Sequence, residues 1–365
     1  MIKFLDLQQQ YLSIKNEIDC AIQSVISSAT FVGGEHVRKF EQAFSVFQHA
    51  KYCIGVGNGT DALEIVIEAL ALPKGSEIIV PANSFIASAE AVTRTGHRVV
   101  FCDCNPGTYT ISPASILSKI TPQTKAIMAV HLYGQPCAMG EIMAIAQAHD
   151  LQVIEDCAQA HGAEYKGQRV GTFGVAGTFS FYPGKNLGAF GDAGAIVTNS
   201  AELAEKCRMI ANHGRLQKYH HAFEGRNSRL DGLQAAILTV KLKHLPTWIK
   251  RRQEIAKHYH KGFANISKVT LPEVLPDSSS VWHLYVIRTM QRDKLQQFLK
   301  AKDVQTSVHY PISLPKLPAY KYCGQENESF VANQFDATYL SLPIGEHLTD
   351  MEVMDVVYYT QEFYD

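Results

Sequence analysis

The feature of this 365-residue sequence that most constrains its fold is an alternation of short β-rich runs with helical stretches. Two intervening stretches, DALEIVIEAL and GEIMAIAQAH, have apolar residues at helical spacing. Such alternation is typical of a mostly parallel sheet with helices on both faces. The β-rich runs are KYCIGV (51–56), EIIVP (77–81), HRVVFCD (97–103), KAIMAV (125–130), LQVIED (151–156), GTFSFY (177–182) and GAIVTN (194–199). We therefore predict an α/β fold.

The pattern becomes shorter and more mixed near residue 246. The elements that it predicts are a charged helix (LPTWIKRRQEIAKHYHKGF), a strand at 281–288, a helix at 292–302, a strand around TSVHY and a closing helix from about 349. Apolar spacing over residues 8–29 predicts a further helix near the start. We predict a large α/β domain over residues 1–245, a smaller α+β domain over residues 246–365, and a cleft between them.

Charge and hydropathy argue against several classes of protein. The chain carries 34 Lys+Arg against 35 Asp+Glu, so no overall field attracts nucleic acid or an anionic membrane surface. No apolar run reaches the roughly 18 residues needed to span a bilayer, and MIKFLDLQQQ lacks the apolar core of a signal peptide. The eight cysteines are scattered without a CxxC pair, which favours reduced core cysteines over zinc ligands. We expect a cytoplasmic protein.

The segment GVGNGTDAL (55–63) has the character of an anion site. A β-rich run ends at Val56, glycines flank Asn58, and Thr60 and Asp61 open a helix. A helix N-terminus offers unpaired N–H groups and a positive dipole end, which suit a phosphate. A plain strand-to-helix turn with Thr60 or Asp61 as its cap explains the same pattern.

The segment VIEDCAQAHGA (153–163) places Glu155 and Asp156 at the end of an apolar strand. Open α/β sheets bind ligands at this edge, and a carboxylate there needs a cationic partner. The partner could be a protonated ring nitrogen of a cofactor or a metal held by Asp156 and His161, although further metal ligands at useful spacing are missing. Alternatively, Asp156 caps the next helix.

The segment TFSFYPGKNLGAFGDAGAIVTN (178–199) carries Lys185 in a glycine-rich loop between two β-rich runs. Small residues let the backbone approach a ligand closely. A lysine with a lowered pKa in a semi-enclosed site can form a Schiff base. The flanking pattern favours this interpretation over a solvated surface lysine.

Together the three segments resemble the sugar aminotransferases of the DegT/DnrJ/EryC1/StrS family, which use pyridoxal 5'-phosphate (PLP) in the aspartate aminotransferase fold, PLP-dependent transferase fold type I. The resemblance extends from FLDLQQQY and FVGG to SVHYPISLP and LSLPIG. Its most specific element is SFYPGKNLGAFGDAGA, and the YPGKNLGA form is most similar to enzymes that aminate carbon 3 of a nucleotide-linked 3-keto-6-deoxyhexose. It implies a large domain with a mostly parallel seven-stranded sheet and a smaller C-terminal α+β domain.

The resemblance also implies roles for individual residues. Lys185 would form the Schiff base and move the proton during transamination, and Asp156 would bind the pyridinium nitrogen. The remaining cofactor contacts would be Gln159 at the ring hydroxyl, Phe85 stacked on the ring, and Gly59, Thr60 and Ser180 at the phosphate, joined by Asn227 of the neighbouring subunit. A homodimer with two shared active sites is therefore the expected working unit.

The substrate side rests on fewer residues. The segment HGRLQKYHHAFEGRNSRLD (213–231) is rich in arginine, lysine and histidine, and a basic loop could bind the diphosphate of a nucleotide sugar or be a solvated surface loop. Its match to the family's NSRLD stretch favours a subunit-spanning active-site loop. Tyr219, His309 and Tyr310 are the candidates for contacts to sugar or nucleotide.

The sequence thus predicts an aminotransferase that moves an amino group from L-glutamate to a dTDP-linked 3-keto-6-deoxyhexose. The product would be a 3-amino-3,6-dideoxyhexose for a surface polysaccharide, such as lipopolysaccharide O-antigen or an S-layer glycan, or for a glycosylated natural product. The alternatives are amination at carbon 4, a non-catalytic regulator with the same fold, and an NAD-dependent sugar enzyme, which the missing G-x-G-x-x-G disfavours. The configuration at carbon 4 and the choice of thymidine or uridine stay open.

Overall fold

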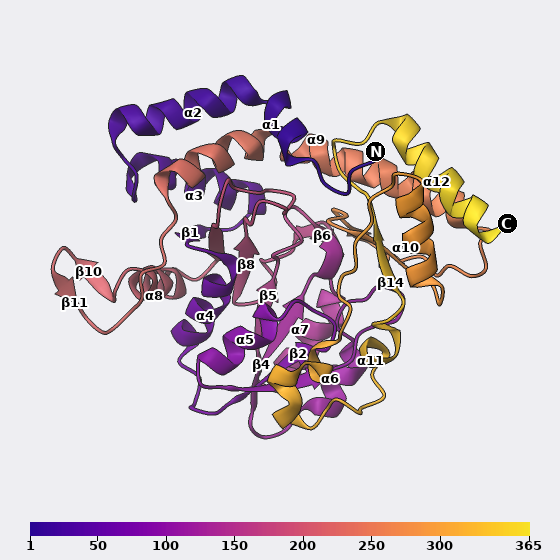
Figure 1. Cartoon of the computed structure of the whole chain (residues 1–365). Coiled ribbons are helices and arrows are strands. Elements are labelled where there is room, and N and C mark those ends of the chain that lie inside the picture. The colour runs from indigo at the N-terminus through magenta and orange to yellow at the C-terminus, as the bar shows by residue number, and fades with distance from the viewer.

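The computed structural model describes the backbone of residues 1–365 and every side chain except that of Leu216. A seven-stranded sheet with the order β1-β9-β8-β5-β4-β2-β3 lies at its centre (Figure 1). The strands are β1 (Tyr52–Val56), β2 (Glu77–Pro81), β3 (Arg98–Cys102), β4 (Thr124–Val130), β5 (Gln152–Asp156), β8 (Ala176–Ser180) and β9 (Gly194–Thr198). Neighbours are parallel except that β9 is antiparallel to β1 and β8. The predicted α/β fold is confirmed.

Both faces of the sheet are buried, because successive side chains of a strand point to opposite faces. In β2, Ile78 and Val80 join one apolar cluster, whereas Ile79 joins another on the opposite face. Helices α4, α5 and α8 cover the first face, and α3, α6, α7 and the start of α9 cover the second. These helices are α3 (Gly34–Gln48), α4 (Gly59–Leu70), α5 (Ala87–Arg94), α6 (Pro113–Lys119), α7 (Met139–Ala148), α8 (Ala201–Ala211) and α9 (Gly232–Phe263).

The chain changes direction across the sheet at β2. Strand β3 lies on one side of β2 and β4 on the other, and their connecting helices α5 and α6 lie on opposite faces. Such a switch point creates a crevice at the carboxyl ends of the strands. The strand register pairs Val130 with Asp156 at this edge. It also pairs Gly194 with Ser180 and with Val56, so the three motifs singled out in the sequence meet here.

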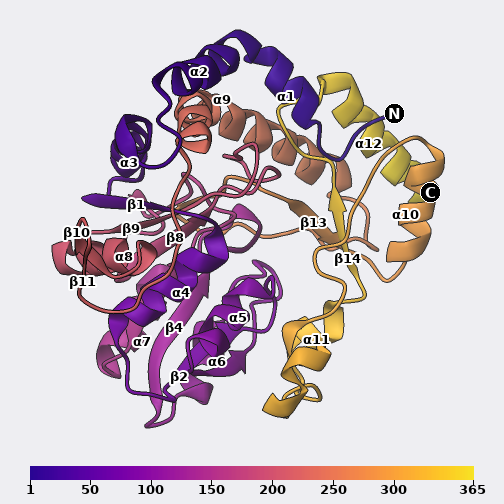
Figure 2. The same ribbon diagram turned by 60° about the vertical axis from the view of Figure 1, so that its left-hand side comes forward.

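The C-terminal part contains a small sheet of its own, in which β13 (Tyr285–Arg288) pairs antiparallel with β14 (Tyr339–Leu342). Helices α10 (Arg292–Ala301) and α12 (Asp350–Tyr364) share its apolar cluster with the end of α9. Figure 2 shows α9 running from α2 and α3 across to α12. The division into residues 1–245 and 246–365 remains a prediction, and α9 continues without interruption through that point.

The remaining elements are short or lie at the periphery. They are α1 (Leu7–Ser13), α2 (Lys15–Ser28), α11 (Val331–Phe335), β6 (Glu164–Tyr165), β7 (Gln168–Arg169), β10 (Arg215–Gln217), β11 (His220–His221), β12 (Ser278–Ser279) and the 3-10 helices η1 (Leu132–Gly134), η2 (Leu314–Lys316) and η3 (Pro318–Cys323). The β10–β11 hairpin extends away from the central sheet (Figure 1). None of the helices that the structure describes combines the length and the apolar character that a membrane crossing requires.

Several predicted element boundaries were wrong. The single helix over residues 8–29 is two helices, because the backbone leaves the helical conformation at Ile14. The charged helix begins at Gly232 rather than at Leu245, and Pro246 lies inside it.

Two predicted strands were also wrong. Only 285–288 of the strand predicted at 281–288 forms a strand, because the Val281 N–H binds the Gly134 carbonyl of a loop instead. The segment TSVHY contributes a single bridge, from Ser307 to Ser341.

Candidate active site

The predicted phosphate residues lie together where β1 passes into α4. Asn58 caps the helix by accepting a 2.8 Å hydrogen bond from the Asp61 N–H, so the first N–H groups of α4, at Gly59 and Thr60, have no acceptor within the helix. A Cβ added to Gly59 would lie 2.7 Å from the Cβ of Ser180, at the end of β8. The glycine therefore keeps open a cradle of backbone N–H and hydroxyl groups that suits an anion.

Asp156 is buried at the end of β5 and its carboxylate is held from two sides. Its Oδ2 accepts a 2.7 Å hydrogen bond from the Ser88 hydroxyl, which shares a second hydrogen bond with Ser84. Its Oδ1 accepts from the Ala158 N–H at 3.1 Å. Turns follow Asp156 rather than a helix, so the helix-cap interpretation of this aspartate is wrong.

Lys185 lies in the loop between β8 and β9, where its N–H donates to the Tyr182 carbonyl at 2.8 Å. Gly188 permits the tight fold of this loop, since a Cβ there would lie 2.2 Å from the Pro183 carbonyl oxygen. Burial lowers the pKa of the Lys185 amine to about 8, and the negative charge of Asp156 opposes this shift. The amine and the carboxylate are therefore close enough to interact electrostatically, and the Schiff-base role of Lys185 stays a prediction.

Gln159 and Tyr310 line the same site. The side-chain oxygen of Gln159 accepts from the Tyr133 N–H at 2.6 Å, and its nitrogen donates to the Tyr310 hydroxyl at 3.1 Å. The ring of Phe85, which is 54% exposed, lies 5.8 Å from the ring of Tyr310. A chain of contacts thus links Phe85, in the loop after β2, to the loop after β5.

His309 and His161 also lie close enough to Lys185 for its positive charge to lower their pKa values. Burial lowers the pKa of His309 to about 4, with a further contribution from the Lys185 charge, and its Nδ1 is 2.8 Å from the Ser341 hydroxyl. Burial and then the charge of Lys185 lower the pKa of His161 to about 3. The Nε2 of His161 faces the Ser180 carbonyl at 2.9 Å, whereas its buried Nδ1 has no partner among the described residues.

Two predicted site residues lie apart from this cluster. Tyr219 is 85% exposed at the turn of the β10–β11 hairpin. Asn227 is exposed in the segment before α9, where it forms a bridge with Asn212. Within the basic segment 213–231, Arg226 forms ion pairs with Glu64 and Glu68 of α4, so its charge is already compensated.

The amino-acid sequence also matches a known protein family. A profile of the DegT/DnrJ/EryC1/StrS aminotransferase family matches residues 12–360. The chain belongs to this family. It is therefore an aminotransferase, and its cofactor is PLP, as the resemblance predicted.

Relatives of known sequence or structure match almost the whole chain. The chain is 47% identical over 357 residues to dTDP-3-amino-3,6-dideoxy-alpha-D-galactopyranose transaminase of Aneurinibacillus thermoaerophilus, which covers 98% of both chains. It is 45% identical over 349 residues to the erythromycin biosynthesis sensory transduction protein EryC1 of Saccharopolyspora erythraea, over 95% of both. The solved structure of S. venezuelae DesV in complex with a ketimine intermediate has a TM-score of 0.97 at 40% identity, covering 100% of this chain and 98% of that one.

The residues present in this aminotransferase fit PLP. The open cradle at Gly59 suits the phosphate, the buried Asp156 carboxylate suits a protonated ring nitrogen, and the Lys185 amine suits the aldehyde. These are distinct observations at one edge of the sheet.

Replacing Gly59 with alanine is expected to weaken PLP binding about tenfold or more. The new methyl group must displace the Ser180 backbone or side chain, and such overpacking typically costs about 1–3 kcal/mol. Titrating the apoprotein with PLP by tryptophan fluorescence measures the affinity. Gly140→Ala, on α7, is the control, since its nearest atom would be the Tyr165 hydroxyl at 3.3 Å. An unchanged affinity in Gly59→Ala would contradict the phosphate assignment.

The rate at which the apoprotein captures PLP covalently should rise with pH and reach half its plateau near pH 8. Only the neutral amine is nucleophilic, and burial lowers the pKa of Lys185 to about 8, compared with about 10.4 for a free lysine. Rapid-mixing absorbance measurements across pH 6–11 test this expectation. A half-maximal rate above about pH 10 would show that Lys185 titrates like a solvated lysine.

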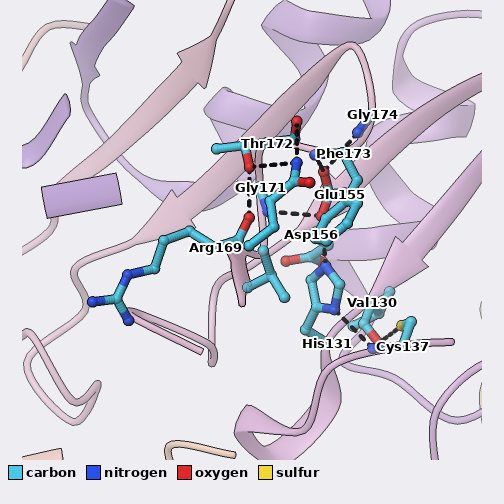
Figure 3. A network of polar contacts seen from close by, with 12 residues as sticks. Val130, His131, Cys137, Glu155, Asp156, Arg169, Gly171, Thr172, Phe173 and Gly174 are labelled. Atoms are coloured by element: carbon cyan, nitrogen blue, oxygen red, sulfur yellow. Dashed lines mark hydrogen bonds and ion pairs between the residues drawn. The ribbon is translucent and has the colours of Figure 1, made fainter. Parts of the chain in front are cut away.

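One prominent feature of the site was not predicted from the sequence. Glu155, the neighbour of Asp156, is completely buried and points to the opposite face of the sheet. Its two carboxylate oxygens accept hydrogen bonds from the N–H groups of Gly171, Phe173 and Gly174 at 2.7–2.8 Å (Figure 3). A charged residue inside an otherwise apolar strand was the available signal.

His131 completes this buried network. Its Nδ1 accepts a 3.0 Å hydrogen bond from the Cys137 N–H, so Nε2 carries the hydrogen that it donates to Glu155 at 3.0 Å (Figure 3). The N–H of His131 also donates to the Asp156 carbonyl. His131, Glu155 and Cys157 are close enough to surround a metal ion, but the histidine and carboxylate lone pairs are already occupied. The network therefore braces the strand end that presents Asp156.

Proposed function

We propose that this chain transfers an amino group from L-glutamate to carbon 3 of a dTDP-linked 3-keto-6-deoxyhexose, giving a dTDP-3-amino-3,6-dideoxyhexose. The observation that supports transamination is the buried Lys185 amine, whose pKa is lowered by burial and which is close enough to the Asp156 carboxylate at the end of β5 to be influenced by its charge. The names of two relatives that act on dTDP-linked 3-amino sugars, 47% and 41% identical to this chain, support the sugar. The product would enter a surface polysaccharide or a glycosylated natural product.

In this proposal each residue of the site has one task. When bound, PLP supplies an electron sink for the negative charge that develops at the reacting carbon. Lys185 would hold the cofactor through its amine and, when that amine is free, would accept and return the proton at the reacting carbon. Asp156, held by Ser88, keeps the ring nitrogen protonated. At an effective dielectric constant near 20 the gross attraction over about 4 Å is roughly 4 kcal/mol.

The other cofactor residues would orient the ring and hold the phosphate. Gln159 would contact the ring hydroxyl, with its position fixed by Tyr133, and Phe85 would stack on the ring face. Gly59, Thr60 and Ser180 would bind the phosphate through N–H and hydroxyl groups.

A homodimer with shared active sites is part of the proposal. Exposed apolar side chains gather at the start of α9, where Phe31 and Val32 lie beside Gly232 and Phe190 binds Gln234. Such a patch is typical of an interface. Asn227, five residues before this helix, would then reach the phosphate of a second copy.

The sugar nucleotide would be bound from both subunits. His309 and Tyr310 lie within the site of the same chain and would contact the sugar. Tyr219 on the exposed hairpin would reach across to the site of the second copy and contact sugar or nucleotide. The basic residues of the same segment other than Arg226, which is paired with Glu64 and Glu68, would meet the diphosphate.

The test is to incubate the PLP-loaded protein with glutamate and with each keto-sugar nucleotide, and to identify the aminated carbon by NMR. Amination at carbon 3 of the dTDP sugar is the expected result. Amination at carbon 4 would show that the chain is a carbon-4 aminotransferase of the same family. One relative is named as a sensory transduction protein. A regulator would leave the cofactor spectrum unchanged after glutamate is added, whereas an aminotransferase converts the cofactor to its amine form.

A further inference from the structure

The residue that follows Lys185 is bound at both ends of its side-chain amide to the C-terminal part of the chain. The Nδ2 of buried Asn186 donates a 3.0 Å hydrogen bond to the Val281 carbonyl. Its Oδ1 lies 3.0 Å from the Nδ1 of His283. Val281 and His283 lie more than 90 residues further along the chain, so this contact ties the lysine loop to a distant segment.

The two contacts of Asn186 fix the tautomer of His283. Because Nδ2 of Asn186 faces a carbonyl, its Oδ1 must be the acceptor. The Nδ1 of His283 therefore carries a hydrogen, and the neutral ring has a bare lone pair at Nε2. Burial lowers the pKa of His283 well below its usual range, and the positive charge of Lys185 is the largest electrostatic contribution. The ring is thus neutral and lies in the field of the lysine.

The segment around His283 is itself held firmly. The buried guanidinium of Arg252, on α9, donates to the Trp282 and His283 carbonyls at 3.2 Å and to the Ile344 carbonyl at 3.0 Å. The Val281 N–H donates to the Gly134 carbonyl at 3.0 Å. Val281 and His283, the two residues that bind Asn186, therefore belong to a segment that is hydrogen-bonded both to α9 and to the loop after β4.

We propose that His283 is a positioning residue for Lys185, which acts by holding Asn186 so that the lysine amine meets the cofactor aldehyde. The lysine loop contains glycines and has no regular structure, and a lysine side chain has about 2 kcal/mol of rotamer entropy. The hydrogen bonds of Asn186 restrict the backbone next to it and therefore the position of the Lys185 Cα. This inference rests on the proposed role of Lys185 in bonding to PLP.

The bond in question forms when the neutral nitrogen of Lys185 adds to the aldehyde carbon. A C=N bond replaces the C=O bond, and the oxygen leaves as one molecule of water. Positioning of Lys185 contributes to this step, whereas the phosphate would be held by Gly59 on α4 and by Ser180 at the end of β8, five residues before Lys185. The charged and titratable groups that act on Lys185 or on His283 are Asp156, His161, His309 and Arg252.

Two ligands separate positioning from cofactor binding in general. PLP can bond to Lys185, whereas pyridoxine 5'-phosphate has no aldehyde and binds only through its ring and phosphate. For Asn186→Ala and His283→Ala we expect about a tenfold loss of affinity for PLP, the scale of one buried hydrogen bond. The affinity for pyridoxine 5'-phosphate should stay within twofold of the wild type. Both are measured by fluorescence titration of the apoprotein.

A conservative variant provides the matched control. His283→Asn keeps an amide N–H where Nδ1 stood but removes Nε2, so it should recover most of the PLP affinity. His283→Gln has no donor at the Nδ1 position and should behave like His283→Ala. Borohydride reduction followed by peptide mass spectrometry should show slower fixation of PLP on Lys185 in Asn186→Ala and His283→Ala.

Three outcomes would overturn the inference or its basis. An equal loss for both ligands would mean that His283 only supports the fold of the site, and no loss for either would mean that Asn186 needs no anchor. Both outcomes reject the positioning role while leaving the proposed function intact. If borohydride fixes no PLP on Lys185 of the wild-type protein, the proposed function fails first, and the inference fails with it.

Discussion

Replacing Lys185 with alanine is expected to abolish transamination and to remove the absorbance of covalently bound cofactor at about 400 nm. Loss of a positioned general base alone typically lowers a rate by about 10²–10⁴-fold, and this variant also loses the covalent attachment. Noncovalent binding of PLP should survive, because the phosphate cradle at Gly59 and Ser180 is untouched. Absorbance spectra and a glutamate-dependent assay measure the two effects.

The matched control is Lys74→Ala. Lys74 is an exposed lysine in the loop between α4 and β2, and its removal should leave the spectrum and the rate unchanged. If Lys185→Ala transaminates at the wild-type rate, another amine bonds to the cofactor and the assignment of the site is wrong. If it loses noncovalent PLP binding completely, the loop itself shapes the cradle, and a Lys185→Gln variant that fills the volume would separate the two causes.

The sheet and the cofactor motifs could be predicted because each depends on local signals. Apolar runs such as EIIVP correspond to strand β2 without any shift of its ends. The position of Asp156 at a strand end and of Lys185 among glycines is a local pattern that indicates a ligand-facing side chain in both cases. Parallel strands then bring their carboxyl ends to one edge, so residues far apart in the sequence meet there.

What could not be predicted depends on contacts between distant segments. Nothing in the residues near Glu155 shows that three N–H groups from residues 171–174 converge on it. The link between Asn186 and His283 spans the two halves of the chain. The start of α9 was misplaced at Leu245, next to Pro246, because a proline usually ends a helix, although a proline inside a helix removes only one backbone hydrogen bond when tertiary packing supports the rest.

Replacing Glu155 with alanine is expected to lower the free energy of unfolding by about 4 kcal/mol or more. The change leaves two buried donors, the Gly171 N–H and the Nε2–H of His131, without an acceptor, together with the half-buried N–H groups of Phe173 and Gly174. Each unsatisfied buried group costs about 1–3 kcal/mol, and the total is a large share of the roughly 5–15 kcal/mol that stabilises a typical domain. Urea unfolding of the apoprotein at fixed protein concentration measures the loss.

Two comparisons separate the lost hydrogen bonds from other effects of the Glu155 substitution. Glu141→Ala removes an exposed glutamate on α7 and should change stability by less than about 0.5 kcal/mol. Glu155→Gln keeps the shape and one acceptor oxygen but turns an amide N–H toward backbone donors. Its free energy of unfolding should therefore lie between those of the wild type and Glu155→Ala. A loss below about 1 kcal/mol in Glu155→Ala would mean that water or a shift of the 171–174 loop satisfies these donors. The backbone N–H of His131 also donates to the backbone carbonyl of Asp156. A large loss of stability in Glu155→Ala should therefore be accompanied by weaker PLP binding, because the His131 segment that contacts Glu155 also helps to place Asp156.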